Sequence, residues 1–123
     1  MMTEAELEIM ETLWAKGEPI YLGELLDVFN ARTKKDWKKQ TLNTFLFKMQ
    51  QKNLVETVEG ARFKKYLPAI TREAYLEDVS KAFLDRNFGG SFAKMLTTLN
   101  GRGKTDEKEI EALKQVLKGW EQE

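Results

Sequence analysis

The sequence of 123 residues contains no cysteine and no histidine. Without cysteine, a disulfide framework and thiolate metal ligands are excluded. Without histidine, the chain lacks the commonest general base and the commonest ligand of transition metals. Acidic residues are numerous, but they alternate with lysine and arginine in helix-like segments, and no glycine-rich phosphate loop is present. We therefore expect no enzymatic activity, no bound metal and no cofactor.

Long apolar runs are also absent. No stretch approaches the length of a membrane span, and the first residues lack the charged and apolar segments of a signal peptide. We therefore expect a soluble, cytoplasmic protein. At this length the chain can form one compact core with an appendage, or two small units, but not two large domains.

Neither charge is in excess overall, because 20 basic residues balance 20 acidic ones. The distribution is uneven, however: the net charge is −6 over residues 1–29, +7 over residues 30–70 and −1 over residues 71–123. A local positive excess of this kind is expected where a protein binds nucleic acid. The middle segment is therefore the candidate binding region.

Residues 36–52 form the most informative stretch of that segment. Leu42, Leu46 and Met49 recur at helical spacing and predict an apolar face that packs on a core. The opposite face carries lysine, threonine and glutamine, which suit phosphate oxygens and base edges in the DNA major groove. A solvated amphipathic helix without a ligand would show the same pattern, so the helix alone does not decide between the two interpretations.

The flanking segments favour DNA binding. Two β-prone runs, residues 54–59 and 62–67, surround Glu59-Gly60-Ala61 and predict a hairpin. Upstream, we expect one helix that is capped by Thr3 and ended by Gly17, and a second over about residues 22–31. The extended segment 18–21 between them can add an edge strand to the hairpin. This order is that of a winged helix-turn-helix, with the later helix as the recognition helix.

We expect DNA contacts from polar residues of the recognition helix and basic residues of the hairpin, or wing. The candidates are Lys38, Lys39, Gln40, Thr41, Asn43, Thr44, Lys48, Arg62 and Lys64. Lys65 is a weaker candidate, because adjacent strand residues face opposite sides of a sheet. Phe63, Tyr66 and Leu67 include the wing residues predicted to pack inward. Phe47 is expected to pack against the preceding helix rather than touch a thymine methyl group.

The last part of the chain predicts three more helices, with N-terminal caps at Thr71, Ser91 and Thr105. They are separated by Gly89-Gly90 and by a mobile-looking loop at residues 100–103. They carry more apolar surface than they can bury alone, which favours a partner, and a second copy of the chain is the simplest one. The alternative is a tail that folds back on a monomer. The candidate dimerisation residues are Tyr75, Val79, Phe83, Phe92, Leu96, Leu113, Leu117 and Trp120.

The sequence thus predicts a mainly α protein with a small β-hairpin. We expect a winged helix-turn-helix DNA-binding domain over residues 1–70 and a helical dimerisation region over residues 71–123. The predicted function is a dimeric, sequence-specific transcriptional repressor acting at a palindromic operator. The alternative is a winged helix used as a protein-interaction module without sequence-specific DNA binding, which the zero overall charge and acidic first helix leave open.

Several motifs resemble those of one family. Residues 3–10 with Leu13-Trp14 look like its opening helix, and Thr41-Leu42-Asn43-Thr44 like its recognition helix. Phe88-Gly89-Gly90-Ser91, followed by residues 107–113, is similar to its dimerisation tail. In this order the motifs resemble the penicillinase-repressor family of bacterial winged-helix regulators, the BlaI/MecI/CopY group. The resemblance implies a homodimeric repressor that binds a palindromic operator in double-stranded DNA.

The sequence departs from that family at three places. In its best-known members a membrane-bound sensor protease cuts an Asn-Phe bond in the tail, which would make such a protease a partner. Here Thr97-Thr98 occupy the corresponding positions, so this route of induction is in doubt. The copper-responsive members use a cysteine cluster that this chain does not have. Lys48 replaces a common arginine, which keeps the charge but loses bidentate guanine recognition.

Overall fold

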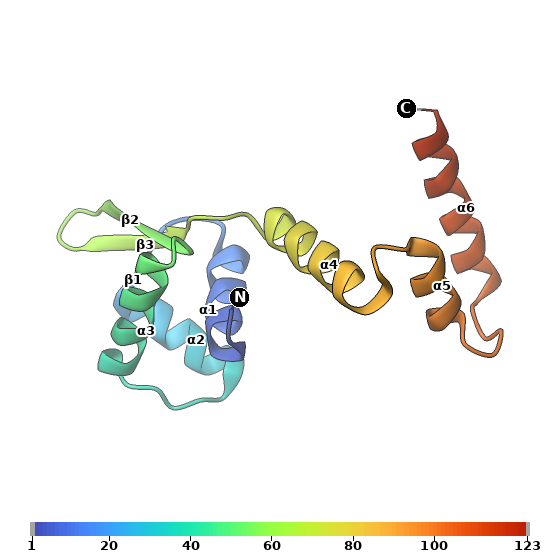
Figure 1. Ribbon diagram of the computed structural model, residues 1–123. Helices are drawn as coiled ribbons and strands as arrows, with labels where there is room; N and C mark the ends of the chain where they lie inside the picture. Colours follow the sequence, from blue (N-terminus) through green and yellow to red (C-terminus); the bar gives the residue numbers. More distant parts are fainter. Residues whose placement is uncertain (1, 123) are drawn as a thin grey trace. The chain divides into compact units, whose positions relative to one another are not determined.

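The element order matches the predicted one. In the computed structural model, which describes residues 2–122, a first unit extends to Asp78 and a second begins at Val79. The first unit contains α1 (Glu4–Lys16), β1 (Ile20–Tyr21), α2 (Leu22–Thr33), α3 (Lys39–Gln51), β2 (Val55–Glu59) and β3 (Lys64–Pro68) (Figure 1). Further along the chain are α4 (Arg72–Phe88), α5 (Phe92–Asn100) and α6 (Glu107–Glu121). The prediction of a mainly α protein with a small hairpin is confirmed.

Local capping signals explain the ends of α1. The Glu6 amide donates to the Thr3 hydroxyl at 3.2 Å, and the Thr3 amide donates to the Glu6 carboxylate at 2.9 Å. This reciprocal pair is the predicted capping box. Gly17 ends the helix with φ of 74°, a conformation that glycine adopts without steric cost.

The three strands form one antiparallel sheet in the order β1-β3-β2, in which Ile20 pairs with Tyr66 and Glu59 pairs with Lys64. The predicted edge strand at residues 18–21 is therefore confirmed as β1. Of the three wing residues among which inward-packing side chains were expected, Tyr66 is buried and Leu67 half-buried, whereas Phe63 is 70% exposed. Phe63 lies in the hairpin loop beyond the last strand pair, where no sheet face can cover it.

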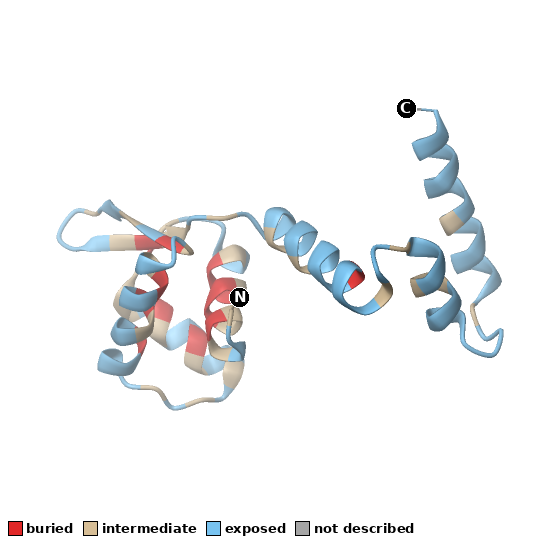
Figure 2. Ribbon diagram, viewed as in Figure 1, coloured by how far each residue is buried: buried red, intermediate tan, exposed pale blue. Residues whose placement is uncertain are grey.

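The core of the first unit lies between its three helices and the sheet. Its fully buried side chains come from α1, β1, α2 and α3 (Figure 2). They are Ile9, Met10, Leu13, Ile20, Leu25, Phe29, Leu42, Leu46 and Met49. The hairpin adds Val55 and Tyr66, which are almost fully buried. Each helix thus buries one apolar face, as its helical spacing predicts. The unit forms a closed core without help from the rest of the chain.

The second unit is built differently. The Lys94 amide donates to the Ser91 hydroxyl at 3.2 Å, which confirms the predicted cap of α5. The cap of α6 is Asp106 and not Thr105: the Asp106 carboxylate accepts from the Lys108 amide at 2.8 Å, and the helix starts one residue later than expected. Both residue types favour caps, so only the backbone path decides between neighbours. No residue of α5 or α6 is buried (Figure 2).

The division between the units falls inside α4, whereas the sequence suggested a boundary at residue 70. Residues 72–78 of α4 belong to the first unit, where the rings of Trp14 and Tyr75 lie 5.7 Å apart. Over residues 2–122, no helix has both the length and the apolar character needed to span a membrane.

Candidate nucleic-acid interface

The loop before α3 is held firmly in place by Asn30 of α2. The Asn30 side-chain amide donates to the Trp37 carbonyl, and the Trp37 amide donates to the Asn30 side-chain oxygen, each at 3.0 Å. The Trp37 ring lies 4.7 Å from both Phe29 and Phe45. Because both its backbone and its ring are fixed, Trp37 sets the position at which α3 begins.

The polar face of α3 points away from the core. Leu42, Leu46 and Met49 have no exposed surface, whereas the candidate residues on the other side are all exposed. These are Lys38, Lys39, Gln40, Thr41, Asn43, Thr44 and Lys48. The Thr44 hydroxyl donates to the Gln40 carbonyl at 2.9 Å, so it presents acceptor lone pairs and a methyl group outward. This arrangement can address both phosphates and base edges.

Phe47 differs from the expectation. It is 60% exposed and is not among the partly buried hydrophobic residues that pack against the core. A helical wheel places it beside the polar face, and only the distance between α2 and α3 decides whether such a position is covered. The structure thus adds an aromatic ring to the exposed side of α3.

The first turn of α3 is suited to an anion. Lys38 occupies the cap position, no side chain caps the free backbone amides, and no acidic residue lies in the first turn. Lys38, Gln40, Thr41, Thr44 and Phe45 line a shallow hollow there. Unpaired amides, the positive end of the helix dipole and a lysine together favour a phosphate oxygen.

The wing is braced by a residue that sequence reasoning missed. The Tyr21 hydroxyl of β1 accepts from the Ala61 amide at 3.1 Å, directly below the hairpin loop. Lys65 is half-buried with its ammonium 4.8 Å from the centre of the Tyr21 ring, while Lys64 and Arg62 are exposed. Tyr21 and Asn30 carry no local signal, because their partners lie 40 and 7 residues away.

Acidic residues of α1 neutralise two lysines of the positive segment. Glu8 pairs with Lys35 at 2.6 Å, and Glu6 pairs with Lys52 at 2.8 Å. Lys38 and Asp36 approach only to 3.9 Å and are both exposed. The remaining candidates Lys39, Lys48, Arg62 and Lys64 have no acidic partner among the residues that the structure describes. The unpaired positive charge is therefore concentrated on α3 and the wing.

The buried Glu6 carboxylate is stabilised in its charged form. Burial alone would raise the pKa of Glu6, but hydrogen bonds from Lys52 and from the Thr3 backbone outweigh it and hold that pKa below its ordinary value. This ion pair joins the start of α1 to the end of α3 and so fixes the orientation of the candidate recognition helix.

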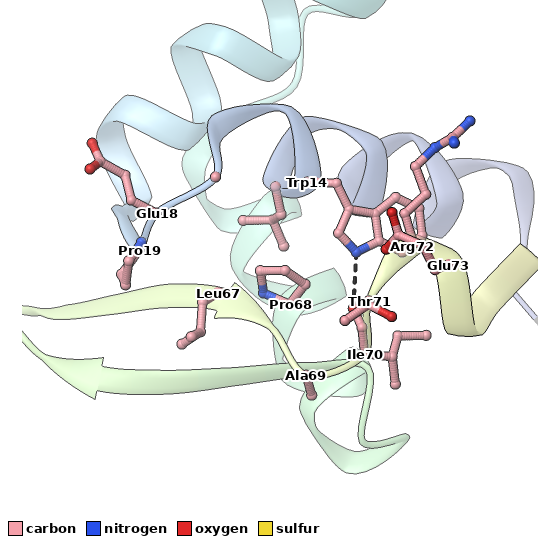
Figure 3. A pocket seen from close by; sticks show the side chains of 12 residues that line it. Trp14, Glu18, Pro19, Leu67, Pro68, Ala69, Ile70, Thr71, Arg72 and Glu73 are labelled. Carbon is pink, nitrogen blue, oxygen red and sulfur yellow. Dashed lines mark hydrogen bonds between the residues drawn. The ribbon is translucent and has the colours of Figure 1, made fainter.

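A separate cleft lies where the chain leaves the wing, between the end of α1, Pro19 and residues 67–73 (Figure 3). The Trp14 indole nitrogen donates to the Ile70 carbonyl at 2.9 Å across it. Across residues 2–122, no buried side-chain nitrogen or oxygen lacks a hydrogen-bond partner. The cleft therefore presents no orphaned polar group for a ligand, and its contacts fix the path into α4.

None of the eight candidate dimerisation residues is fully buried: four are exposed and four are half-buried. Phe83, Phe92, Leu117 and Trp120 are exposed, with 54% of Phe92 and 52% of Trp120 accessible. Tyr75, Val79, Leu96 and Leu113 are half-buried. Phe92 and Trp120 pack together at 5.6 Å between ring centres, so α5 and α6 share one apolar face.

Known proteins with similar sequences are bacterial regulators. A family model described as penicillinase repressor matches residues 2–119. The penicillinase repressor of Bacillus licheniformis is 27% identical over 94% of this chain and 88% of its own length. The methicillin resistance regulatory protein MecI of Staphylococcus aureus strain N315 is 21% identical over 94% of this chain and 92% of its own.

One solved structure resembles the fold. It is the solution structure of the monomeric form of Bacillus licheniformis BlaI in complex with the blaP half-operator. The similarity covers 61% of this chain and 88% of that chain, with a TM-score of 0.51 and 25% sequence identity.

Proposed function

The chain belongs to the penicillinase repressor family, whose members are transcriptional regulators and not enzymes, and from this premise we propose that it is a homodimeric repressor of a palindromic operator in double-stranded DNA. The observation that carries the proposal is the exposed face of α3 with the adjoining wing, which together bear most of the unpaired positive charge of the first unit. In this reading α3 enters the major groove and the wing contacts the flanking backbone.

Each candidate residue has a role that follows from its chemistry. Lys38, Lys39 and Lys48 neutralise phosphates around the groove, and Arg62 and Lys64 do so from the wing. Gln40, Asn43 and Thr44 contact base edges, since amide and hydroxyl groups discriminate between base pairs in the major groove. Thr41, in the first turn, contacts the backbone together with the free amides of α3.

The dimer part of the proposal is supported by the apolar face of the second unit. Ile110, Val116, Leu117 and Trp120 all expose more than a third of their surface on one helix. Exposing this much apolar surface to water is unfavourable in free energy for an isolated helix pair. A second copy related by a two-fold axis presents the same apolar surface and can cover it. Because the BlaI structure is of a monomeric form on a half-operator, two protomers of this chain would occupy two half-sites of a palindrome.

The DNA-binding part is tested by titrating the full-length protein with duplex from its own upstream region at several salt concentrations, with scrambled duplex as competitor. Five basic contacts per protomer give a slope of log affinity against log salt of up to about −9 for a dimer. Lys64→Ala is expected to weaken binding to all duplexes and reduce the slope by about 2, whereas Lys16→Ala, at the end of α1, is the matched control. Thr44→Ala is expected instead to relax sequence preference.

Binding that does not depend on salt, or that Lys64→Ala and Lys16→Ala change equally, would contradict the proposed surface. Absence of duplex binding would favour the protein-interaction alternative.

The dimer part is tested separately by sedimentation equilibrium. Leu117→Glu adds a charge to the apolar face of α6, and we expect it to raise the dimer dissociation constant at least tenfold, because the carboxylate would be desolvated. Gln115→Glu adds the same charge two residues away, on the other side of the helix, and is expected to leave the constant nearly unchanged. A wild-type protein that stays monomeric at tens of micromolar would overturn the dimer and leave the DNA-binding test unaffected.

A further inference from the structure

We infer that Phe47 recognises the C5-methyl group of a thymine in the operator and is a specificity-determining residue of α3. The inference rests on the proposed function, because it requires α3 to enter the major groove of duplex DNA. It names one base that the half-site must contain, which the polar candidates alone do not.

Phe47 is exposed, whereas the aromatic residues that precede it in α2, in the loop before α3 and in α3 are packed. Phe29 is fully buried, and Trp37 and Phe45 are stacked at 4.7 Å between ring centres. Phe47, by contrast, leaves 60% of its surface to solvent. Single exposed apolar side chains are common on proteins, so exposure alone carries no conclusion. Its position on the helix is the second observation.

The position of Phe47 around the axis of α3 places it among the residues that face away from the core. At 3.6 residues per turn, Phe47 lies about 140° from the buried Leu42, about 60° from Thr44 and about 40° from Gln51. Thr44 and Gln51 are both exposed. When the side of α3 opposite the core meets DNA, the Phe47 ring is therefore within the contact surface and not at its rim.

The chemistry of a phenyl ring selects its partner. The ring offers no hydrogen bond to phosphates or to base donors and acceptors, and burying those groups against it would cost free energy. The one apolar group that B-DNA presents in the major groove is the thymine C5-methyl. Contact between the ring and this methyl removes apolar surface of both from water. An A·T pair in one orientation is then preferred at that position.

The test begins with a duplex site selected by the full-length protein from a random-sequence library. Each thymine of one half-site is replaced in turn by deoxyuridine, which lacks the methyl group and keeps the base-pairing edge. Affinities are measured for the wild type, for Phe47→Ala, and for Phe63→Ala, which removes another exposed ring, from the wing. Far-UV circular dichroism checks that the variants remain folded.

At one thymine we expect deoxyuridine to weaken wild-type binding about 4-fold, the effect of one buried methyl group. Phe47→Ala is expected to bind both duplexes within about 1.5-fold of each other, since the ring that contacts the methyl is gone. Phe63→Ala is expected to keep the full wild-type response. At the same position, we expect the wild type to bind a duplex with 5-methylcytosine more tightly than one with cytosine. The modified base restores the methyl group but carries the cytosine amino group in place of the thymine O4 carbonyl.

Deoxyuridine penalties that are the same in the wild type and Phe47→Ala would overturn the inference while leaving the proposed repressor function intact. A selection that returns no preferred sequence would overturn both. A penalty lost equally in Phe47→Ala and Phe63→Ala would also overturn it, because a general weakening of binding would then explain the result.

Discussion

In the first unit, side-chain hydrogen bonds join residues as far apart as Trp14 and Ile70, whereas in the part of the second unit that the structure describes none joins residues more than five positions apart. The described ion pairs all lie in the first unit. The first unit is thus held together by long-range contacts within one chain. The second has helices that are well formed locally but little that joins them.

Burial follows the same division. The first unit encloses eleven buried core residues, whereas Leu84 is the single buried hydrophobic residue described in the second. A unit with its own core can orient a recognition helix at any protein concentration. In the proposed dimer a second copy would cover the apolar face of the second unit, so the stability of that unit would depend on protein concentration. The two units thus differ in how they bury apolar surface: the first has its own core, and the second leaves its apolar face exposed.

The largest expected effect contrasts two phenylalanines. Phe29→Ala removes a fully buried ring of the first unit, and we expect it to lower the free energy of unfolding by about 3–5 kcal/mol. Phe92→Ala removes an exposed ring of the second unit that contacts Trp120, and we expect a loss of about 1 kcal/mol or less under monomeric conditions. Urea denaturation followed by circular dichroism measures both. Equal losses would show that the second unit has a core of its own.

The next effect comes from Gly60 in the hairpin loop. A Cβ atom built there would overlap the Phe63 carbonyl oxygen and would lie 2.7 Å from the Tyr21 ring. Because the first of these is a backbone atom, Gly60→Ala must displace the loop and the Tyr21 hydroxyl that holds it. We expect a cost of about 1–3 kcal/mol in thermal or urea unfolding. Unchanged stability would contradict the close packing of Gly60 against the loop and Tyr21.

A third effect concerns Glu6 and pH. Since the folded pKa of Glu6 lies below its ordinary value, the ion pair stabilises the protein above the unfolded pKa, and this contribution is lost as pH falls through the folded pKa. Glu6→Gln is expected to cost about 1–2 kcal/mol at pH 7, by weakening both the capping box and the Lys52 contact. The difference from the wild type should shrink as pH falls below about 4. Glu4→Gln, on the exposed side of the same turn, is the control, and an equal pH dependence in both variants would contradict the assignment.

The contrast between the units also separates what the sequence predicts from what it does not. Helical spacing and caps are local, so the ranges of α1 and α4, the cap at Ser91 and the end at Gly17 could be read directly. The exposure of Phe47 and Phe63 could not be predicted in this way. For Phe47 it depends on how closely α2 approaches α3, and for Phe63 on where the strand pairing of the hairpin ends. The Asn30–Trp37 and Glu6–Lys52 contacts could not be predicted either, because no pattern in a single sequence indicates that these positions lie close together in space. The candidate DNA and dimer residues remain predictions, since exposure alone does not reveal a partner.

The smallest expected effect is a gain in the second unit. Gly119 lies within α6 with no described atom within 4 Å of a built Cβ, so Gly119→Ala is expected to stabilise the helix by up to about 1 kcal/mol. The same substitution destabilises at Gly60, which makes the two variants a matched pair. Helical content measured by circular dichroism across a range of protein concentrations gives the sign. If helical content rises in dilute protein but dimer affinity falls, the second copy packs against the Gly119 side of α6. If helical content rises at all protein concentrations, that side of α6 faces solvent.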